Sequence, residues 1–201
     1  MKRSGLFLSL LLWVIAPAAH SAIIYSGVQN IAVPQSFAGV YVNILTKATS
    51  FSQPGNFDTA PWINLDFGGI DISNGNTLRP VIIAPNRVVN LTTAQSVGSP
   101  SNLPPGANFS DSHTGPAAGQ FQLLTVGYAG YGFSATVGAP VQYGWARITI
   151  SNAGNGTLHD WAYEGVANTS IQVGTVPEPG GAVLMLGGMA SLLRRRRPLR
   201  R

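Results

Sequence analysis

Short apolar segments alternate with polar and turn-forming residues along most of the chain. The pattern predicts strands at residues 23–25, 28–33, 40–46, 62–67, 81–84, 87–91, 121–126, 131–135, 143–150, 157–163 and 171–173. Gly, Pro, Asn and Ser separate nearly all of these segments, as is typical of turns. Between residues 23 and 175 no window of about 11 residues keeps an apolar period of 3.6 without Gly or Pro. We therefore predict an all-β body over residues 23–175, folded as an antiparallel β-sandwich or jelly roll.

Turn residues predict where strands reverse. Asn74-Gly75 and Asn155-Gly156 are candidates for tight hairpin turns, because Asn-Gly tolerates a positive φ. The second dipeptide separates residues 143–151 from residues 157–165, which we expect to pair, with the register open by a residue or two. The side chains then expected to face one another are Trp145, Ile148 and Ile150 on one strand and Leu158, Trp161 and Tyr163 on the other. Residues 96–118 are rich in Pro, Gly, Ser and Asn, which predicts a long surface loop.

Residues 1–22 have the features of a secretory signal peptide. Lys2 and Arg3 precede an apolar run over residues 6–16, and Pro17 and small residues follow. We expect this segment to form a helix and to be removed by cleavage after Ala22, with cleavage after Ala18 as the alternative. An uncleaved anchor is disfavoured, because the 11-residue apolar run is shorter than the roughly 20 residues of a membrane span.

The other end of the chain carries a second apolar run, over residues 180–193, which follows TVPEPGG and precedes four consecutive arginines. As a helix this run is about 21 Å long, short of a hydrocarbon core of about 30 Å, but arginine stems extend such a span. Arginine-rich flanks stay in the cytoplasm, so the body is expected to face outward. This arrangement predicts a C-terminal transmembrane helix. With the motif before it and the arginines after it, the helix forms the third segment of the chain, residues 176–201, after the leader and the body.

Residues 176–201 resemble the PEP-CTERM sorting domain. Pro177, Glu178 and Pro179 match its motif, residues 180–193 its helix, and the basic end is formed by Arg194, Arg195, Arg196 and Arg197. The resemblance implies export by the secretion translocon, a transient stay in the inner membrane, and cleavage by exosortase, a multipass membrane enzyme. The resemblance further implies delivery to the envelope, the extracellular matrix or the medium of a Gram-negative bacterium. Bacteria with this sorting domain make exopolysaccharide, which is therefore a candidate partner. Residues 23–30 and 143–166 loosely resemble ectodomains that accompany this domain, without implying an activity.

The distribution of charge excludes a nucleic-acid partner. The formal net charge is +5, but two of the 12 basic residues lie at the extreme N-terminus and six at the extreme C-terminus. Residues 23–175 contain four basic and six acidic residues, a net charge of −2. They therefore have too few basic side chains to form a groove that binds phosphates. The chain has no cysteine, which excludes disulfides, thiolate zinc sites and cysteine nucleophiles.

Candidate catalytic side chains are few, and we expect no catalytic, cofactor or metal site. A Gly-x-Ser-x-Gly elbow is absent from the sequence. His113 falls in the predicted loop. His159 precedes Asp160 on a predicted strand, where neighbours point to opposite faces, so a pair of base and orienting carboxylate is not expected.

Two pairs of carboxylates are close in sequence, Asp66 with Asp71 and Asp160 with Glu164. Glycoside hydrolysis needs two such groups across a cleft, but solvated carboxylates are the favoured interpretation. The segment that offers oxygen ligands for calcium lacks the EF-hand spacing and its closing Glu; its candidate ligands are Asp66, Asp71, Ser73 and Asn76.

The sequence thus predicts a non-enzymatic structural or interaction protein of the envelope or exopolysaccharide matrix. The alternative is a carbohydrate-binding module, which would need Trp62, Trp145 and Trp161 on an exposed face. A secreted hydrolase that uses the carboxylates above is a third and weaker possibility.

Overall fold

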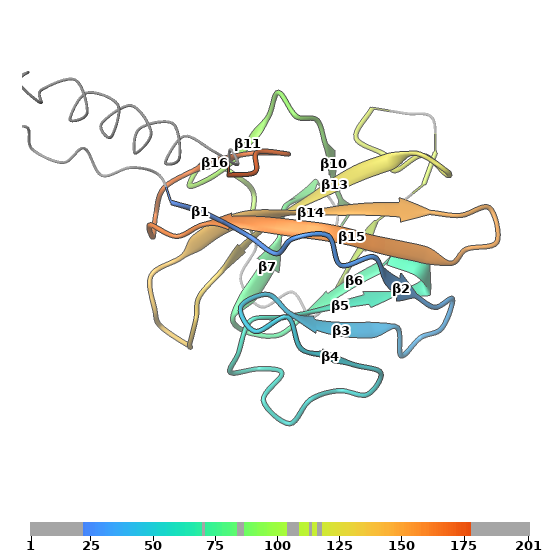
Figure 1. Cartoon of the computed structure of the whole chain (residues 1–201), viewed down its shortest axis with the longest axis horizontal. Helices are drawn as coiled ribbons and strands as arrows, with labels where there is room; N and C mark the ends of the chain where they lie inside the picture. The colour runs from blue at the N-terminus through green and yellow to red at the C-terminus, as the bar shows by residue number, and fades with distance from the viewer. Residues whose placement is uncertain are drawn as a thin grey trace, which may run out of the picture.

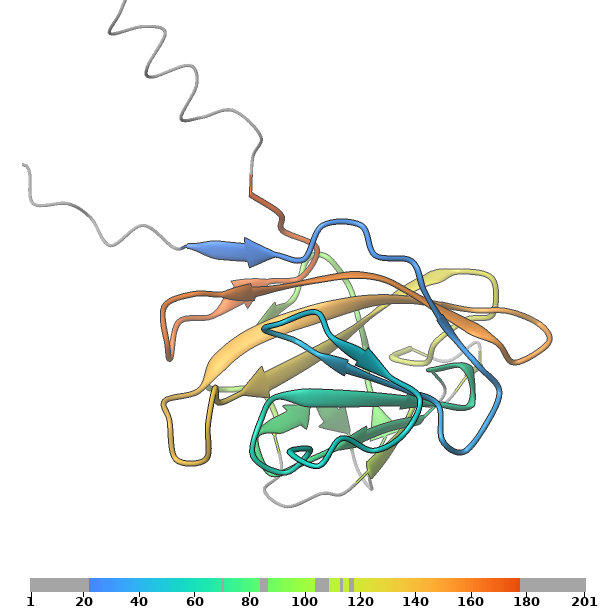
Figure 2. The same cartoon turned by 60° about the horizontal axis from the view of Figure 1, so that its bottom comes forward.

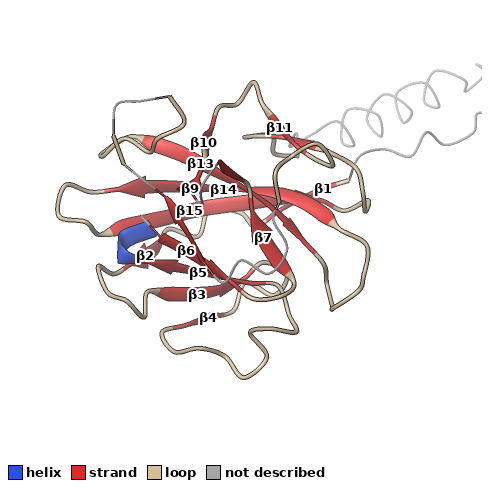
Figure 3. Cartoon of the chain, turned by 180° about the vertical axis from the view of Figure 1, so that it is seen from behind, coloured by secondary structure: helices blue, strands red, loops and turns tan. Residues whose placement is uncertain are grey.

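The structure is a computed structural model that describes residues 22–69, 71–83, 87–103, 109–112, 114–115 and 118–177. The predicted signal-peptide helix and the predicted transmembrane helix lie outside these residues. Among the described residues the only helical element is the 3-10 turn η1 (Phe67–Gly69), shown in Figure 3, and none of them forms a helix that could span a bilayer.

The first large sheet runs β1-β15-β14-β13-β10 and is antiparallel throughout (Figure 1). Its edges are extended by β2, which pairs with β15, and by β7, which pairs with β13. Its strands are β1 (Ile23–Tyr25), β2 (Ile31–Val33), β7 (Leu78–Pro80), β10 (Asn90–Leu91), β13 (Val126–Phe133), β14 (Gln142–Ile150) and β15 (Gly156–Glu164).

The second large sheet runs β4-β3-β5-β6-β12-β9-β8. Its pairs are antiparallel except β12 with β9, which is parallel. Its strands are β3 (Val40–Asn43), β4 (Thr49–Ser50), β5 (Trp62–Asp66), β6 (Asp71–Asn74), β8 (Ile82–Ile83), β9 (Arg87–Val88) and β12 (Phe109–Ser112). A small third sheet pairs β11 (Ser96–Val97) with β16 (Ile171–Gln172).

The two large sheets share one hydrophobic core. Val42 and Leu65 from the second sheet pack in the same cluster as Tyr131, Ile148 and Trp161 from the first. The sheets therefore form two layers, which Figure 2 shows from another side. Burial of these side chains is the main source of the stability of the layers, at about 25 cal/mol for each Å² of apolar surface removed from water.

The opposite face of the first sheet is covered as well. Trp145 on β14 packs there with Val97 of β11 and Ile171 of β16 in a second cluster. Strands β13, β14 and β15 are consequently buried over most of their length, and the first sheet is the centre of the molecule.

The prediction of an all-β body with antiparallel sheets is confirmed. Residues 23–25 form β1 with the predicted bounds, and the predicted hairpin exists as β14 and β15. Ile148 lies opposite Leu158 as expected, whereas Trp145 lies opposite Ala162 and not opposite an aromatic residue.

Several predicted strand bounds are wrong. Residues 96–118 are not one loop, because they contain β11 and β12. Residues 87–91 form two strands in different sheets, β9 and β10. The segments 121–126 and 131–135 are replaced by one strand, β13, whose glycines permit close packing: a Cβ on Gly130 would lie 2.6 Å from Leu91 Cδ1.

The two Asn-Gly dipeptides do not act as predicted. Asn74-Gly75 closes no hairpin, because β6 and β7 belong to different sheets. Gly75 is required by crowding, since a Cβ there would lie 2.3 Å from the carbonyl oxygen of Phe57. In the β14–β15 turn the positive φ belongs to Gly154, at 77°, and not to Asn155 or Gly156.

Candidate functional site

The predicted sorting motif begins where the described body ends. Val176 and Pro177 are exposed after the last strand, β16. Glu178, Pro179 and the arginines at 194–197 lie outside the described residues. Strands β1 and β16, the first and last strands of the body, lie at the same end of the molecule (Figure 1).

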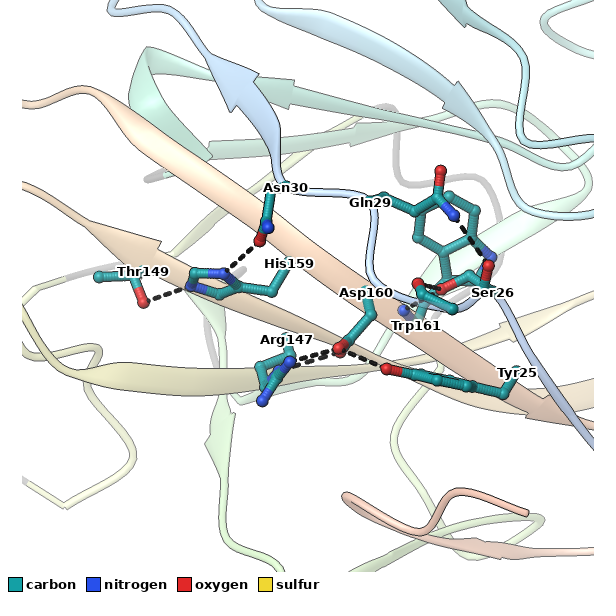
Figure 4. Close-up of polar contacts among 10 residues, drawn as sticks. Tyr25, Ser26, Gln29, Asn30, Arg147, Thr149, His159, Asp160 and Trp161 are labelled. Atoms are coloured by element: carbon teal, nitrogen blue, oxygen red, sulfur yellow. Dashed lines mark hydrogen bonds and ion pairs between the residues drawn. The ribbon is translucent and has the colours of Figure 1, made fainter. Parts of the chain in front are cut away.

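A β-bulge at His159 changes the geometry expected for the His159–Asp160 pair. Arg147 lies opposite Asp160 and Ile148 opposite Leu158, which leaves His159 as the extra residue of β15. The side chains of His159 and Asp160 bond to Thr149 and Arg147, two residues apart on β14 and therefore on one face (Figure 4). The prediction that the two side chains point to opposite faces is wrong, because it assumed a regular strand.

Asp160 is a buried carboxylate with charged and polar partners. It is 1% exposed, and Arg147 Nε donates to its Oδ1 at 3.0 Å while Arg147 Nη2 forms an ion pair with Oδ2. The Tyr25 hydroxyl donates to Oδ2 at 2.8 Å, and burial, together with this bond, raises the pKa of Tyr25. Asp160 thereby connects β1 to β14 through β15.

His159 has a partner on each ring nitrogen. Nε2 lies 2.8 Å from Thr149 Oγ1, and Nδ1 lies 3.1 Å from Asn30 Oδ1. Burial and the neighbouring Arg147 lower the pKa of His159, so the imidazole is neutral at pH 7. With Nδ1–H donating to Asn30, Nε2 accepts from the Thr149 hydroxyl.

A hydroxyl, an imidazole and an orienting amide in this order also occur in nucleophilic catalysis. Here the main-chain contacts indicate an architectural role: the His159 carbonyl oxygen accepts from the amides of Gln29 at 2.7 Å and Asn30 at 3.1 Å. The network holds the segment between β1 and β2 against the bulge, as Figure 4 shows for the side chains.

The carboxylate pair Asp66 and Asp71 is brought together by strand pairing. Asp66 lies opposite Asp71, and Asp111 of β12 lies opposite Asp71 on its other side, so three acidic positions are aligned across neighbouring strands. Asp111 was missed because the sequence placed it in a loop. The described residues contain no group of three His, Cys, Asp or Glu side chains placed to hold a metal ion.

Asp160 and Glu164 are too far apart for glycoside hydrolysis. Four positions along β15 separate them by about 13 Å, beyond the roughly 9.5 Å of an inverting pair. Glu164 is fully buried, and its Oε1 accepts from the backbone N–H groups of Ala22 at 2.8 Å and Val166 at 3.1 Å.

The three tryptophans that a carbohydrate-binding module would need on an exposed face are buried. Trp62 is 7% exposed, and Trp145 and Trp161 are each 1% exposed. The indole N–H of Trp62 donates to Asn56 Oδ1 and that of Trp161 to the carbonyl oxygen of Ile44, each at 3.0 Å. A sugar therefore has no access to these rings, which counts against the alternative of a carbohydrate-binding module with a tryptophan platform.

A cavity of about 270 Å³ lies beside the ends of β7 and β13. Its lining includes Arg79, Asn76, Leu103, Ser134, Val137 and Val141. Arg79 is partly exposed, and its guanidinium forms no hydrogen bond or ion pair with any described residue. By contrast, Lys47 donates to the carbonyl oxygen of Ser26 and Arg147 pairs with Asp160. Sequence analysis missed this cavity because its lining comes from three separate parts of the chain.

Comparison of the chain with protein-family models, with curated proteins and with solved structures gives no significant match. The functional assignment therefore rests on the residues of the chain itself.

Proposed function

We propose that the protein is exported through the inner membrane, held there by its C-terminal helix, and processed by an exosortase. Its mature body, of the β-sandwich class, then serves a structural or interaction role in the envelope, the exopolysaccharide matrix or the medium. The observation that carries this proposal is the order of features after residue 175: Pro177-Glu178-Pro179, an apolar run and four arginines, together with a leader at the other end.

The folded body supports the proposal in two respects. Its first strand β1 and its last strand β16 lie at one end of the molecule (Figure 1), so the chain enters and leaves the body on the side that would face one bilayer. Val176 is 44% exposed and Pro177 is also exposed, which leaves the start of the motif accessible to a membrane enzyme. No catalytic activity of the body is part of the proposal.

Substitution of the motif tests the sorting function. The triple variant Pro177→Ala, Glu178→Ala, Pro179→Ala should stay in the inner-membrane fraction of cells that contain the exosortase, whereas the unaltered protein leaves it. Val176→Ala, next to the motif, is the matched control and should behave as the unaltered protein. Equal release of the triple variant would contradict the role of the motif.

The unpaired Arg79 favours a second function, binding of an acidic polysaccharide in the cavity. A guanidinium at a cavity that also offers Asn76 and apolar side chains suits a sugar that carries a carboxylate. A neutral polysaccharide could accept hydrogen bonds from the guanidinium but would leave its charge without a counterion.

Binding measurements with a polyuronate and with neutral dextran test this second function. Arg79→Met should weaken binding of the polyuronate about tenfold or more, the effect of one charge-assisted hydrogen bond. Arg87→Met removes an exposed cation that does not line the cavity, and it should leave the affinity unchanged. Equal affinities of Arg79→Met and the unaltered protein, or equal binding of dextran, would exclude the site.

A further inference from the structure

The first described residue is already part of the fold. The backbone N–H of Ala22 donates to Glu164 Oε1 at 2.8 Å, and the carbonyl oxygen of Ala22 accepts from the N–H of Gly165 at 2.8 Å. Glu164 is 0% exposed, whereas Ala22 is exposed. Ala22 is thus an exposed residue whose amide nitrogen bonds to a buried carboxylate.

These bonds distinguish the possible mature N-termini by whether the polar groups of the fold keep their partners. Cleavage after Ala22, the boundary expected from the sequence, would remove the residue that supplies both bonds. The buried carboxylate of Glu164 and the N–H of Gly165 would each lose a partner, which is unfavourable for buried polar groups. Cleavage after Ala18 would leave three residues, 19–21, ahead of the first residue that the fold holds.

The sequence immediately before Ala22 suits a different boundary. Signal peptidase sites have small residues at the first and third positions before the cut. For a cut between Ser21 and Ala22 these positions are Ser21 and Ala19, both small. For a cut after Ala22 the third position is His20, which is larger.

We propose that signal peptidase hydrolyses the Ser21–Ala22 bond and that the new α-ammonium of Ala22 pairs with the carboxylate of Glu164. This inference rests on the proposed function, because it requires export with a cleavable leader. Water adds across the amide bond, so the leader leaves with a carboxylate on Ser21 and the mature chain begins with a protonated amine on Ala22. A neutral N–H donor thereby becomes a charged one, which strengthens the bond to Glu164.

The position of the ion pair keeps the desolvation penalty of its charges low. The ammonium stays at the exposed end of the chain, where water satisfies its other protons, and only the carboxylate is buried. The pair fixes β1 to β15 at Ile23, whose register partner is Glu164. Removal of the leader would therefore strengthen the attachment of β1, the strand that follows the leader, to β15.

The mature N-terminus of the full chain, exported from cells, tests the site directly by sequencing or mass spectrometry. The unaltered protein and His20→Leu should both begin at Ala22, because position 20 is then the second residue before the cut. Ser21→Leu places a bulky residue at the first position and should abolish cleavage at this bond. A mature chain that begins at Ile23 or Ala19, or unchanged cleavage of Ser21→Leu, would overturn this inference and leave export intact. Retention of Met1 to Ser21 in a protein that stays in the cytoplasmic fraction would overturn export itself.

Amine labelling tests the ion pair. A succinimidyl ester reacts with the uncharged form of an amine and not with the ammonium. A carboxylate partner that raises the pKa of the α-amine by one unit should therefore slow labelling of Ala22 at about pH 7 by about tenfold. The mature form of Glu164→Gln keeps a hydrogen-bond acceptor without the charge and should be labelled about tenfold faster than the unaltered protein. Equal rates would overturn the pairing of Ala22 with Glu164.

Discussion

The buried carboxylate of Asp160 is held by two side chains, because Arg147 bonds to both of its oxygens and the Tyr25 hydroxyl donates to Oδ2. Asp160→Asn removes the charge of a buried pair and leaves Arg147 without its ion. We expect the free energy of unfolding to fall by about 3 kcal/mol, measured by urea denaturation. Asp58→Asn, at an exposed position, is the control and should change it by less than about 0.5 kcal/mol. A similar small change for Asp160→Asn would show that the pair contributes little.

His159 predicts a dependence of stability on pH. Its pKa in the fold is lowered from the ordinary value of 6.5, mainly by burial and then by Arg147, while Asp160 acts in the opposite direction. As the pH falls below 6.5, the unfolded chain takes up the proton first, so the free energy of unfolding decreases until folded His159 is also protonated. His159→Gln should flatten this decrease between about pH 7 and pH 5, measured by denaturation at each pH. Parallel profiles for the two proteins would contradict this assignment.

At the residue scale the sequence predicted few of these contacts. Asp160 and Glu164 are carboxylates, which are almost never fully buried unless paired. Arg147 lies opposite Asp160 in the predicted hairpin, but the register was left open, and Ala22 reaches Glu164 from a distant part of the chain. The bulge that aligns His159 with Asp160 has no sequence signal, because it depends on how β15 meets β14.

At the element scale, the β14–β15 hairpin depends on close backbone contact with η1. A Cβ on Gly156 would lie 1.7 Å from the carbonyl oxygen of Gly68, which is backbone and cannot rotate away. Gly156→Ala should therefore lower the free energy of unfolding by about 3 kcal/mol. Gly138→Ala is the matched control, since its φ of 82° is strained for alanine but its Cβ would meet nothing within 4 Å. That variant should lose about 1 kcal/mol, and equal losses in thermal denaturation would contradict the crowding.

Strand prediction succeeded where apolar alternation extends over several residues, as in β5, β14 and β15. It failed for β4 and β11, which have two residues each and cannot show alternation. The glycines of β13 were taken as a break, although they lie within an eight-residue strand. The pairing of β12 with β9 is parallel. It could not be predicted from sequence patterns, because only the tertiary fold brings these two strands side by side.

At the scale of the whole molecule, the central sheet is covered on both faces, which explains why Trp161 on one face and Trp145 on the other are both buried. Sequence composition predicted the β class, but it could not predict that two-residue strands would cover the second face. The same folding leaves Arg79 beside a cavity and brings Ala22 to Glu164. The proposed sorting segments, in contrast, are inferred from the order of residues along the chain and needed no tertiary information.

The central claim is that residues 176–201 are a sorting signal that an exosortase processes. Mass spectrometry of the C-terminus, in matched cells with and without the exosortase, measures this directly. We predict that the mature protein lacks Arg194 to Arg201 only when the enzyme is present. A mature chain that keeps these arginines in exosortase-containing cells would contradict the account.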